Sequence, residues 1–204
     1  MAQFTTLFFD IGGVILTNGW DQPARRHAAE TFSLDWDNFE HRHQQAVDAF
    51  ETGRMGIDEY IAKIVFDHPR PFAADDFKRF MFTQSQEMPE SRKFVDQFAR
   101  LPQYLVAAIN NEGREVNAYR IAKFDLGHTF SMFFSSCYVG IRKPDPAIFR
   151  LALDVTQRKS AESIFVDDRE ENLEGARQAG IAAIQFKNVA QLESDLRNMG
   201  VGLA

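Results

Sequence analysis

The sequence has little of several features that define common classes of protein. It contains one cysteine, Cys137, so no disulfide can form within the chain, and a zinc site would need histidine and carboxylate ligands. No apolar run reaches the roughly 18 residues that a membrane-spanning helix needs. The first residues also lack the basic region and small-residue cleavage site of a secretory signal. We therefore expect a cytoplasmic protein that has no membrane partner.

Basic charge is also scarce. The chain has 23 Lys and Arg residues against 29 Asp and Glu residues, which gives a net charge of −6, and it has no basic stripe. Proteins that bind nucleic acids present clustered basic side chains to many phosphates, so a nucleic-acid partner is not expected. An acidic protein can still bind one small phosphate if a metal ion and a lysine concentrate positive charge locally. The expected partner is a small molecule, and monomer and homodimer both stay open.

What the sequence does contain is an alternation of short apolar runs with segments of helical periodicity. Buried strands are predicted at 4–9, 104–109, 163–166 and 182–186, and helices at about 172–178 and 189–199. Between about 21 and 100 the periodicity predicts four or five helices and no strand. The pattern indicates an α/β fold, in which a Rossmann-like parallel sheet has helices on both faces. We expect a core of residues 1–16 and 101–204 and an inserted α-helical cap of residues 17–100.

Polar side chains follow three of the predicted strands directly. Asp10 follows the first strand, Asn110 and Asn111 the second, and Asp167 and Asp168 the third. The carboxyl ends of parallel strands meet at one edge of the sheet, where ligands bind. Three carboxylates at one point repel each other unless a cation lies between them, and Mg²⁺ prefers such oxygen ligands. The sequence therefore predicts a magnesium site at this edge.

Four segments, in order, resemble the motifs of the haloacid dehalogenase-like superfamily. They are FFDIGGVIL, AINN, GIRKPDPAIF and IFVDDREENLEGARQAGI, and they span nearly all of the chain outside the helical insertion. The insertion itself, with ETGRMGIDEYI inside it, resembles the helical cap of that family. The resemblance implies a hydrolase that acts on a small phosphorylated metabolite with Mg²⁺.

The resemblance also implies roles for individual residues. Asp10 matches the nucleophile that attacks phosphorus and forms an aspartyl-phosphate. Lys143 matches the lysine that holds the phosphate and neutralises charge beside the nucleophile. Asp168 matches the principal metal ligand, Asp167 a ligand through water or a brace, and Gly12 a backbone carbonyl ligand.

Two positions depart from the family pattern. Gly12 stands where most family phosphatases have a second aspartate as general acid and base, although some sugar phosphatases, such as glucose-1-phosphate phosphatases, also have glycine there. Asn110 stands where Ser or Thr usually donates a hydrogen bond to phosphate, so we expect Asn110 to take that role or Asn111 to share it. Asn172 is expected to support the site or to cap its helix.

Other features leave alternatives open. Trp20 lies in a segment expected to pass over the catalytic edge, so it is a candidate for substrate contact, whereas the five histidines, His43 among them, are expected to be solvated. A metal-independent 2-haloacid dehalogenase is a second reading, which the pair Asp167 and Asp168 disfavours. A phosphate-ester binding protein with little or no turnover is a third, supported by Gly12 and Asn110.

Overall fold

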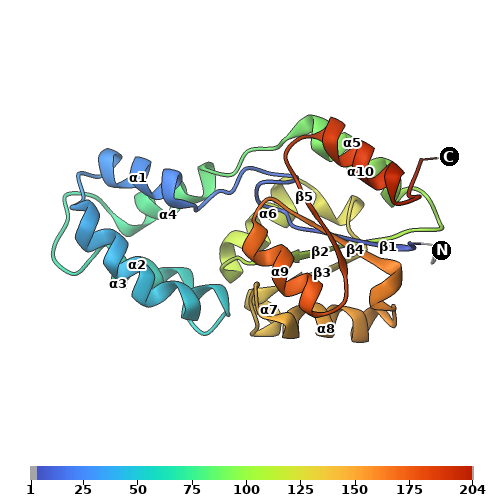
Figure 1. Ribbon diagram of the computed structural model, residues 1–204. Coiled ribbons are helices and arrows are strands. Elements are labelled where there is room, and N and C mark those ends of the chain that lie inside the picture. Colours follow the sequence, from blue (N-terminus) through green and yellow to red (C-terminus); the bar gives the residue numbers. More distant parts are fainter. Residues whose placement is uncertain (1–3, 204) are drawn as a thin grey trace.

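A five-stranded parallel sheet forms the centre of the molecule (Figure 1). The computed structural model describes residues 4–203 and orders the strands β3-β2-β1-β4-β5. The strands are β1 (Thr6–Phe9), β2 (Leu105–Asn110), β3 (Met132–Ser135), β4 (Ser163–Asp167) and β5 (Ala182–Gln185). Because every neighbouring pair is parallel, the carboxyl ends of all five strands lie at the same edge. The predicted α/β fold with a parallel sheet is confirmed.

Strand β3 is the one strand of the sheet that the sequence pattern did not predict. It has four residues, of which Met132 is exposed and Phe133 half-buried. It pairs with β2 in the register that sets Asn110 beside Ser135. No glycine or proline lies between 130 and 137 to mark the ends of the strand. Its short apolar run therefore could not be separated from the helical periodicity around it.

Helices cover both faces of the sheet. The helices α5 (Pro89–Ala99) and α10 (Val189–Asn198) lie on one face, and α8 (Pro146–Thr156) and α9 (Glu170–Gln178) on the other, while α6 (Arg114–Lys123) and α7 (Ser136–Val139) follow β2 and β3 (Figure 1). Along β1, Leu7 and Phe9 join one apolar cluster and Phe8 the other. Burial on both faces explains the continuous apolar run. No helix of the described residues has the length and apolarity needed to cross a membrane.

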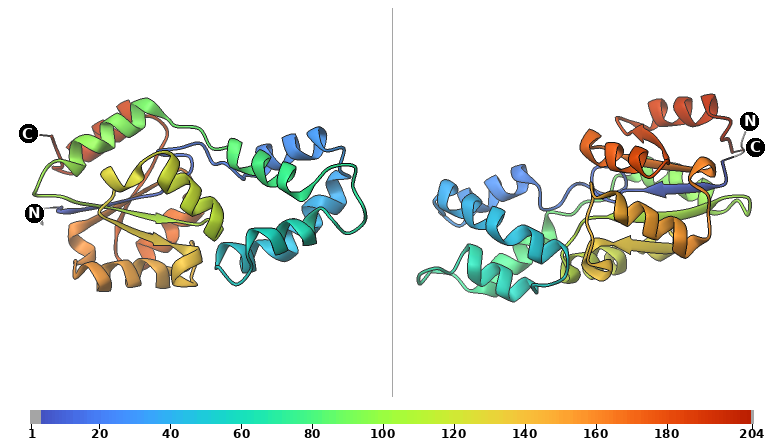
Figure 2. Two further views of the ribbon diagram at one scale, coloured as in Figure 1. Left: turned by 180° about the vertical axis from the view of Figure 1, so that it is seen from behind. Right: turned by 60° about the horizontal axis from the view of Figure 1, so that its bottom comes forward.

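Four helices form a group of their own beyond the carboxyl edge of the sheet (Figures 1 and 2). They are α1 (Gln22–Thr31), α2 (Trp36–Glu51), α3 (Ile57–Ile64) and α4 (Ala74–Thr83). Asp21 and Asp35 cap the first two by accepting hydrogen bonds from backbone N–H groups. An aromatic-rich apolar cluster, distinct from the two clusters of the sheet, fills the group. The helices predicted between 21 and 100 therefore exist.

Helix α5 packs differently from the other helices of the predicted cap range 17–100. Its residues Phe94, Val95 and Phe98 belong to the apolar cluster of the sheet. The chain passes between sheet and helical group through two adjacent segments, in which the Thr17 amide donates to the Gln86 carbonyl at 2.9 Å. Helix α5 therefore packs its apolar face against the sheet, whereas α1–α4 pack on one another.

Candidate active site

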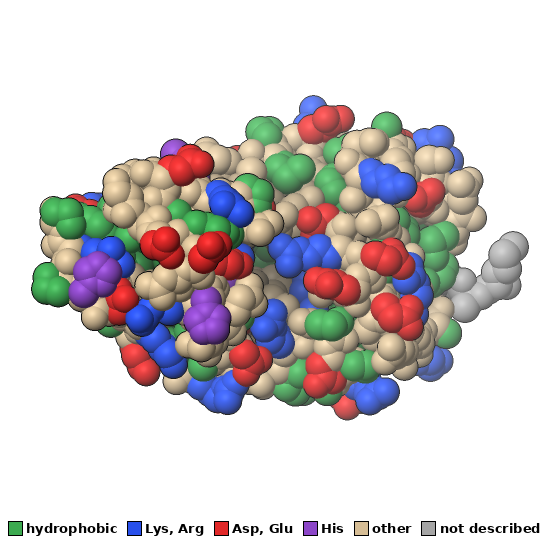
Figure 3. Space-filling model, turned by 60° about the vertical axis from the view of Figure 1, so that its left-hand side comes forward, with side chains coloured by type: hydrophobic (Ala, Val, Ile, Leu, Met, Phe, Trp, Pro, Cys, Tyr) green, Lys and Arg blue, Asp and Glu red, His purple; other side chains and the backbone are tan. Residues whose placement is uncertain are grey.

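A cavity of about 490 Å³ lies between the carboxyl edge of the sheet and the helical group. Asp10, Asn111 and Lys143 line it from the sheet side, and Trp20 and His43 from the helical side. Figure 3 shows the surface hollowed between the two parts, with charged side chains of both signs around the hollow. The cavity is therefore lined by residues that are distant in the sequence.

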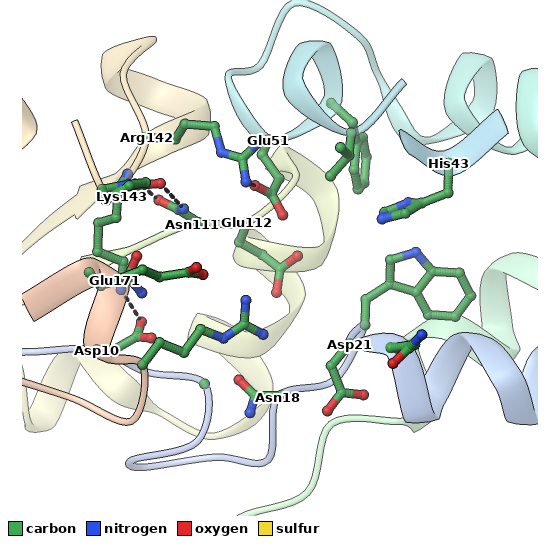
Figure 4. A pocket seen from close by; sticks show the side chains of 18 of the residues that line it. Asp10, Asn18, Asp21, His43, Glu51, Asn111, Glu112, Arg142, Lys143 and Glu171 are labelled. Atoms are coloured by element: carbon green, nitrogen blue, oxygen red, sulfur yellow. Dashed lines mark hydrogen bonds and ion pairs between the residues drawn. The ribbon is translucent and has the colours of Figure 1, made fainter. Parts of the chain in front are cut away.

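Three carboxylates converge at the carboxyl edge of the sheet, and one of them, Asp10, lines the cavity. Asp10 follows β1, and Asp167 and Asp168 end and follow β4, the strand beside it. One oxygen of each lies within 4.8 Å of the others. Lys143 Nζ lies 2.9 Å from Asp10 Oδ1 (Figure 4). It also lies 2.7 Å from Asp167 Oδ2. The arrangement brings together the four charged residues that the sequence placed at this edge.

Asn111 holds the loop that carries Lys143. Its Nδ2 donates to the Lys143 carbonyl, and its Oδ1 accepts from the Lys143 amide, both at 2.8 Å. The lysine side chain is 1% exposed, so its charge depends on the two carboxylates beside it. Asn111 thus lines the cavity and also positions the lysine.

Asn172 braces Asp167. Its Nδ2 lies 3.0 Å from both carboxylate oxygens of Asp167, and the Arg169 amide donates to Oδ1 at 2.8 Å. Asn172 lies in the first turn of α9, but its side chain is directed to Asp167, and the helix has no side-chain cap at Arg169. Of the two expectations for Asn172, its contacts match support of the site.

Asp168 keeps one oxygen without a partner. Asn18 Nδ2 donates to Oδ2 at 3.1 Å, whereas Oδ1 is buried and makes no hydrogen bond within the described residues. Gly13 allows this placement, because its φ is +71° and a Cβ there would lie 2.3 Å from Asp168 Oδ2. Three carboxylates with an unpaired buried oxygen and a single lysine leave negative charge in excess. This oxygen-only set fits a hard divalent cation such as Mg²⁺.

Burial governs the titration of these groups. It raises the pKa of Asp10 to about 7, because the loss of solvation outweighs the opposing charge of Lys143. Burial likewise raises the pKa of Asp168. For Lys143, burial acts to lower the pKa, but Asp10 and Asp167 outweigh it and raise the pKa. The lysine therefore stays charged beside the two carboxylates.

Gly12 also lines the cavity, and the space beside it is already taken. A Cβ at this position would lie 2.8 Å from Asn18 Oδ1. Asn18 therefore fills the space into which an aspartate at position 12 would extend. Because an asparagine side chain does not titrate, it cannot replace a carboxylic acid in proton transfer.

Asn110 lies apart from the cavity. Its Nδ2 donates to Asn117 Oδ1 at 2.9 Å, and its Oδ1 accepts from Ser135 Oγ at 2.8 Å. It is 2% exposed and is not among the residues lining the cavity. The predicted contact between Asn110 and phosphate thus has no support in this geometry, because β2 directs the amide into the hydrogen bonds with Asn117 and Ser135.

The sequence analysis missed several ion pairs in the cavity wall. Glu112 Oε2 accepts from Arg120 at 2.6 Å, and Glu51 Oε2 lies 2.9 Å from Arg142 Nη2. Burial raises the pKa of Glu51 to about 6, although Arg142 opposes the shift. Figure 4 shows both carboxylates directed into the cavity. Glu112 and Arg142 could have been suspected, because each adjoins a predicted site residue, and Glu51 because it opens the segment ETGRMGIDEYI that resembles the family's cap.

The structure agrees with the expected position of Trp20 but not with that of His43. Trp20 lines the cavity, as expected for a residue that passes over the catalytic edge. The expectation of a solvated His43 is wrong, because α2 directs it inward and it is 4% exposed. His43 and Trp20 both contact the hydroxyl of Tyr60. This wall of the cavity therefore contains polar groups as well as aromatic rings.

The parallel sheet, the cluster of carboxylates at its carboxyl edge and the helical group above it define an α/β enzyme whose site lies between two parts of one chain. The sequence model of the haloacid dehalogenase-like hydrolases matches residues 4–180. The chain therefore belongs to the haloacid dehalogenase-like hydrolase family.

Curated relatives include phosphatases. Glyceraldehyde 3-phosphate phosphatase of Pyrococcus furiosus is 24% identical over 96% of this chain and 86% of its own length. Phosphoserine phosphatase of Thermus thermophilus is 33% identical over 47% of this chain and 39% of its own. Bifunctional epoxide hydrolase 2 of Rattus norvegicus is 33% identical over 37% of this chain, and the match covers only 14% of that protein.

Solved structures share the fold. A HAD family enzyme of Bacteroides thetaiotaomicron, in complex with magnesium and inorganic phosphate, has a TM-score of 0.75 at 18% identity, over 93% of this chain and 98% of that one. L-2-haloacid dehalogenase of Xanthobacter autotrophicus has a TM-score of 0.66 at 15% identity, over 99% of this chain and 85% of that one. At these identities the likeness concerns the fold.

Proposed function

We propose that the chain is a magnesium-dependent phosphatase that hydrolyses a small phosphorylated metabolite through an aspartyl-phosphate on Asp10. A sugar phosphate is one candidate for the substrate. The observation that carries the proposal is the convergence of Asp10, Asp167 and Asp168 within 4.8 Å beside Lys143, with Asp10 and Lys143 lining the cavity. The relatives named as phosphatases support the same reaction.

Asp10 is the proposed nucleophile. Its Oδ1 accepts from the Ile11 amide at 2.7 Å and lies 2.9 Å from Lys143 Nζ, so Oδ2 is the oxygen left free within the described residues. Attack of Oδ2 on phosphorus forms the aspartyl-phosphate and breaks the bond to the alcohol oxygen. Lys143 stabilises the phosphoryl oxygens, and water then hydrolyses the intermediate.

The proposed metal ligands are Asp10, Asp168 and the carbonyl of Gly12, with Asp167 holding the metal through water or bracing the site. A bound Mg²⁺ neutralises the carboxylates and the phosphate and polarises the phosphoryl oxygens. Asn172 and Asn111 are proposed to position Asp167 and Lys143. Each does so through the two hydrogen bonds described above.

The helical group is proposed to act as a cap that shields the reaction from water. The proposed cap comprises α1–α4, with α5 assigned to the core. Trp20 is the proposed cap contact for substrate. With Gly12 in place of an acid, protonation of the leaving group falls to another group, and Glu51 is a candidate because it lines the cavity and burial raises its pKa to about 6.

Phosphate release from a panel of phosphorylated metabolites tests the proposal. We expect Mg²⁺-dependent release that EDTA abolishes and that falls by at least about 10³-fold in Asp10→Asn. Asp154→Asn is the matched control, because it makes the same Asp-to-Asn substitution at an exposed residue of α8. Activity unchanged in Asp10→Asn would refute the nucleophile.

The same assay separates the alternatives. Release of halide from 2-haloacids without metal would favour the dehalogenase, whose fold this chain shares. Magnesium-dependent binding of phosphate esters without any turnover would favour the binding protein. Either result would overturn the proposed reaction.

A further inference from the structure

Three buried polar groups form a hydrogen-bonded chain, of which two, Trp20 and His43, line the cavity and the third, Tyr60, lies behind them. Trp20 Nε1 donates to Tyr60 Oη at 2.9 Å, and Tyr60 Oη lies 2.6 Å from His43 Nδ1. Tyr60 is fully buried, with its ring stacked on Phe50 at 4.1 Å. The hydroxyl therefore has no access to solvent and must find its partners within this chain of groups.

The hydrogen bonds determine where each proton lies. Indole Nε1 can only donate, so Tyr60 Oη accepts from Trp20 and must direct its own proton elsewhere. His43 Nδ1 is the partner available, so Nδ1 accepts. The opposite arrangement would leave a buried O–H without an acceptor, which is costly. The proton of a neutral His43 ring is therefore on Nε2.

The surroundings keep the His43 ring neutral. Arg25 lies close to it but is paired with Glu40, through Nε at 2.8 Å and Nη2 at 2.7 Å. Burial, and to a smaller extent Arg25, lower the pKa of His43 to about 4, with Glu40 opposing and Arg142 adding to the shift. The Tyr60 hydroxyl does not ionise, because burial raises its pKa. Burial, with Arg25 and Arg142, thus outweighs Glu40 and keeps the ring neutral.

The second nitrogen of the ring is directed to the cavity. His43 lines the cavity, and Nε2 makes no hydrogen bond within residues 4–203. Figure 4 shows the ring reaching from α2 into the cavity, on the side opposite Asp10 and Lys143. A neutral ring with its proton on Nε2 offers one uncharged donor to the cavity, which suits an uncharged acceptor oxygen.

We propose that His43 is a specificity-determining residue that donates from Nε2 to an uncharged acceptor oxygen, a hydroxyl or carbonyl, in the organic part of the substrate. Tyr60 is a positioning residue, which holds the ring in this tautomer and orientation. The proposal rests on the proposed phosphatase function and adds the substrate class, a phosphate ester with oxygen functions remote from phosphorus. A neutral donor at a buried site rejects an analogue that lacks the acceptor, because Nε2–H would then stay unpaired.

Nitrogen-15 NMR of the histidine rings tests the tautomer without any need for activity. We expect one ring, identified by its absence in His43→Leu, to carry its proton on Nε2 and to stay neutral at a pH well below 6.5, the ordinary histidine pKa. Tyr60→Phe should release the ring to a mixture of tautomers. A proton on Nδ1 in the intact protein, or a charged ring near neutral pH, would overturn the proposal.

Kinetics test the recognition. For hexose monophosphates, His43→Leu should lower kcat/KM by roughly 5- to 150-fold, mostly through KM, because it removes one donor to a buried acceptor. His43→Gln, which keeps a donor, should recover part of the loss. Phenyl phosphate is the control ester, because its ring offers no acceptor oxygen beyond the ester bond, and its hydrolysis should change by less than about threefold.

The outcomes distinguish the two levels of the proposal. Equal losses for phenyl phosphate and hexose monophosphates in His43→Leu, or no loss for either, would overturn the role of His43 and leave the phosphatase function in place. Hydrolysis of phenyl phosphate alone by the intact protein would do the same. If no ester is hydrolysed, the proposed function fails, and the kinetic role of His43 fails with it.

Discussion

Gly175→Ala should perturb the proposed active site through the loop that carries Lys143. Gly175 is buried within α9, where alanine is the better helix former by about 1 kcal/mol. The new Cβ, however, would lie 2.0 Å from the carbonyl oxygen of Pro144 and 3.1 Å from the Phe149 ring. The Pro144 carbonyl belongs to the residue after Lys143, so a local repulsion acts directly on the loop that carries the lysine.

The structure sets the size of the effect. Real Cβ atoms do not approach a carbonyl oxygen closer than 3.0 Å, so the Pro144 carbonyl or α9 must move by about 1 Å. Overpacking of this kind costs roughly 1–3 kcal/mol, which outweighs the gain in helix propensity. Lys143 Nζ now lies 2.9 Å from Asp10 and 2.7 Å from Asp167, so a shift of about 1 Å would lower activity by about 10²-fold.

Two measurements check this prediction. Urea unfolding should show a loss of stability in Gly175→Ala, and phosphate release should fall far more than the loss of folded protein explains. Gly127→Ala is the control, because nothing lies within 4 Å of a Cβ at Gly127. A Gly175→Ala protein as active and as stable as the parent would refute the reasoning that α9 sets the position of Lys143.

Three further predictions concern stability. Burial lowers the pKa of His43 to about 4, so between about pH 6.5 and pH 4 the unfolded chain binds a proton that the folded chain does not. The free energy of unfolding should therefore fall by up to about 1.4 kcal/mol per pH unit as the pH is lowered through this range. Urea titrations of His43→Gln should not show this loss. Arg120→Met leaves the buried Glu112 carboxylate unpaired and should cost roughly 3–5 kcal/mol, with recovery when Glu112→Gln is added; a cost below about 1 kcal/mol would contradict it. Gly113→Ala sets a Cβ 2.1 Å from Phe50 Cζ and should cost about 1–3 kcal/mol in thermal or urea unfolding, unless Phe50→Leu makes room.

The site shows which predictions depend on local sequence alone. The apolar runs before Asp10 and Asp167 form neighbouring parallel strands, so their carboxylates meet because the chain direction requires it. Lys143 was expected beside Asp10 because GIRKPDPAIF resembles a family motif, and Pro146 of that segment is the first residue of α8. The direction of the Asn172 side chain did not follow from local sequence, which left support of the site and helix capping both open until its contact with Asp167 was seen.

The positions of Asn110 and His43 depended on hydrogen-bond partners from segments that are distant in the sequence. Asn110 is the last residue of β2 and Asn111 follows it, but Ser135 of β3 and Asn117 of α6 hydrogen-bond the Asn110 amide inside the protein. His43 looked like a surface residue, because its neighbours on α2 are polar, yet Tyr60 from α3 receives it. No local pattern could show these partners.

The sequence by itself determined the parallel sheet, the edge at which the carboxylates lie, and the helical insertion, because strand and helix periodicity and turn residues act over a few neighbouring positions. Only the tertiary structure decided which strand end turns its amide inward, that α5 belongs to the sheet, and that His43 faces the cavity. These depend on burial and hydrogen-bond partners supplied by segments far apart in the chain, and such partners are set only when the chain packs.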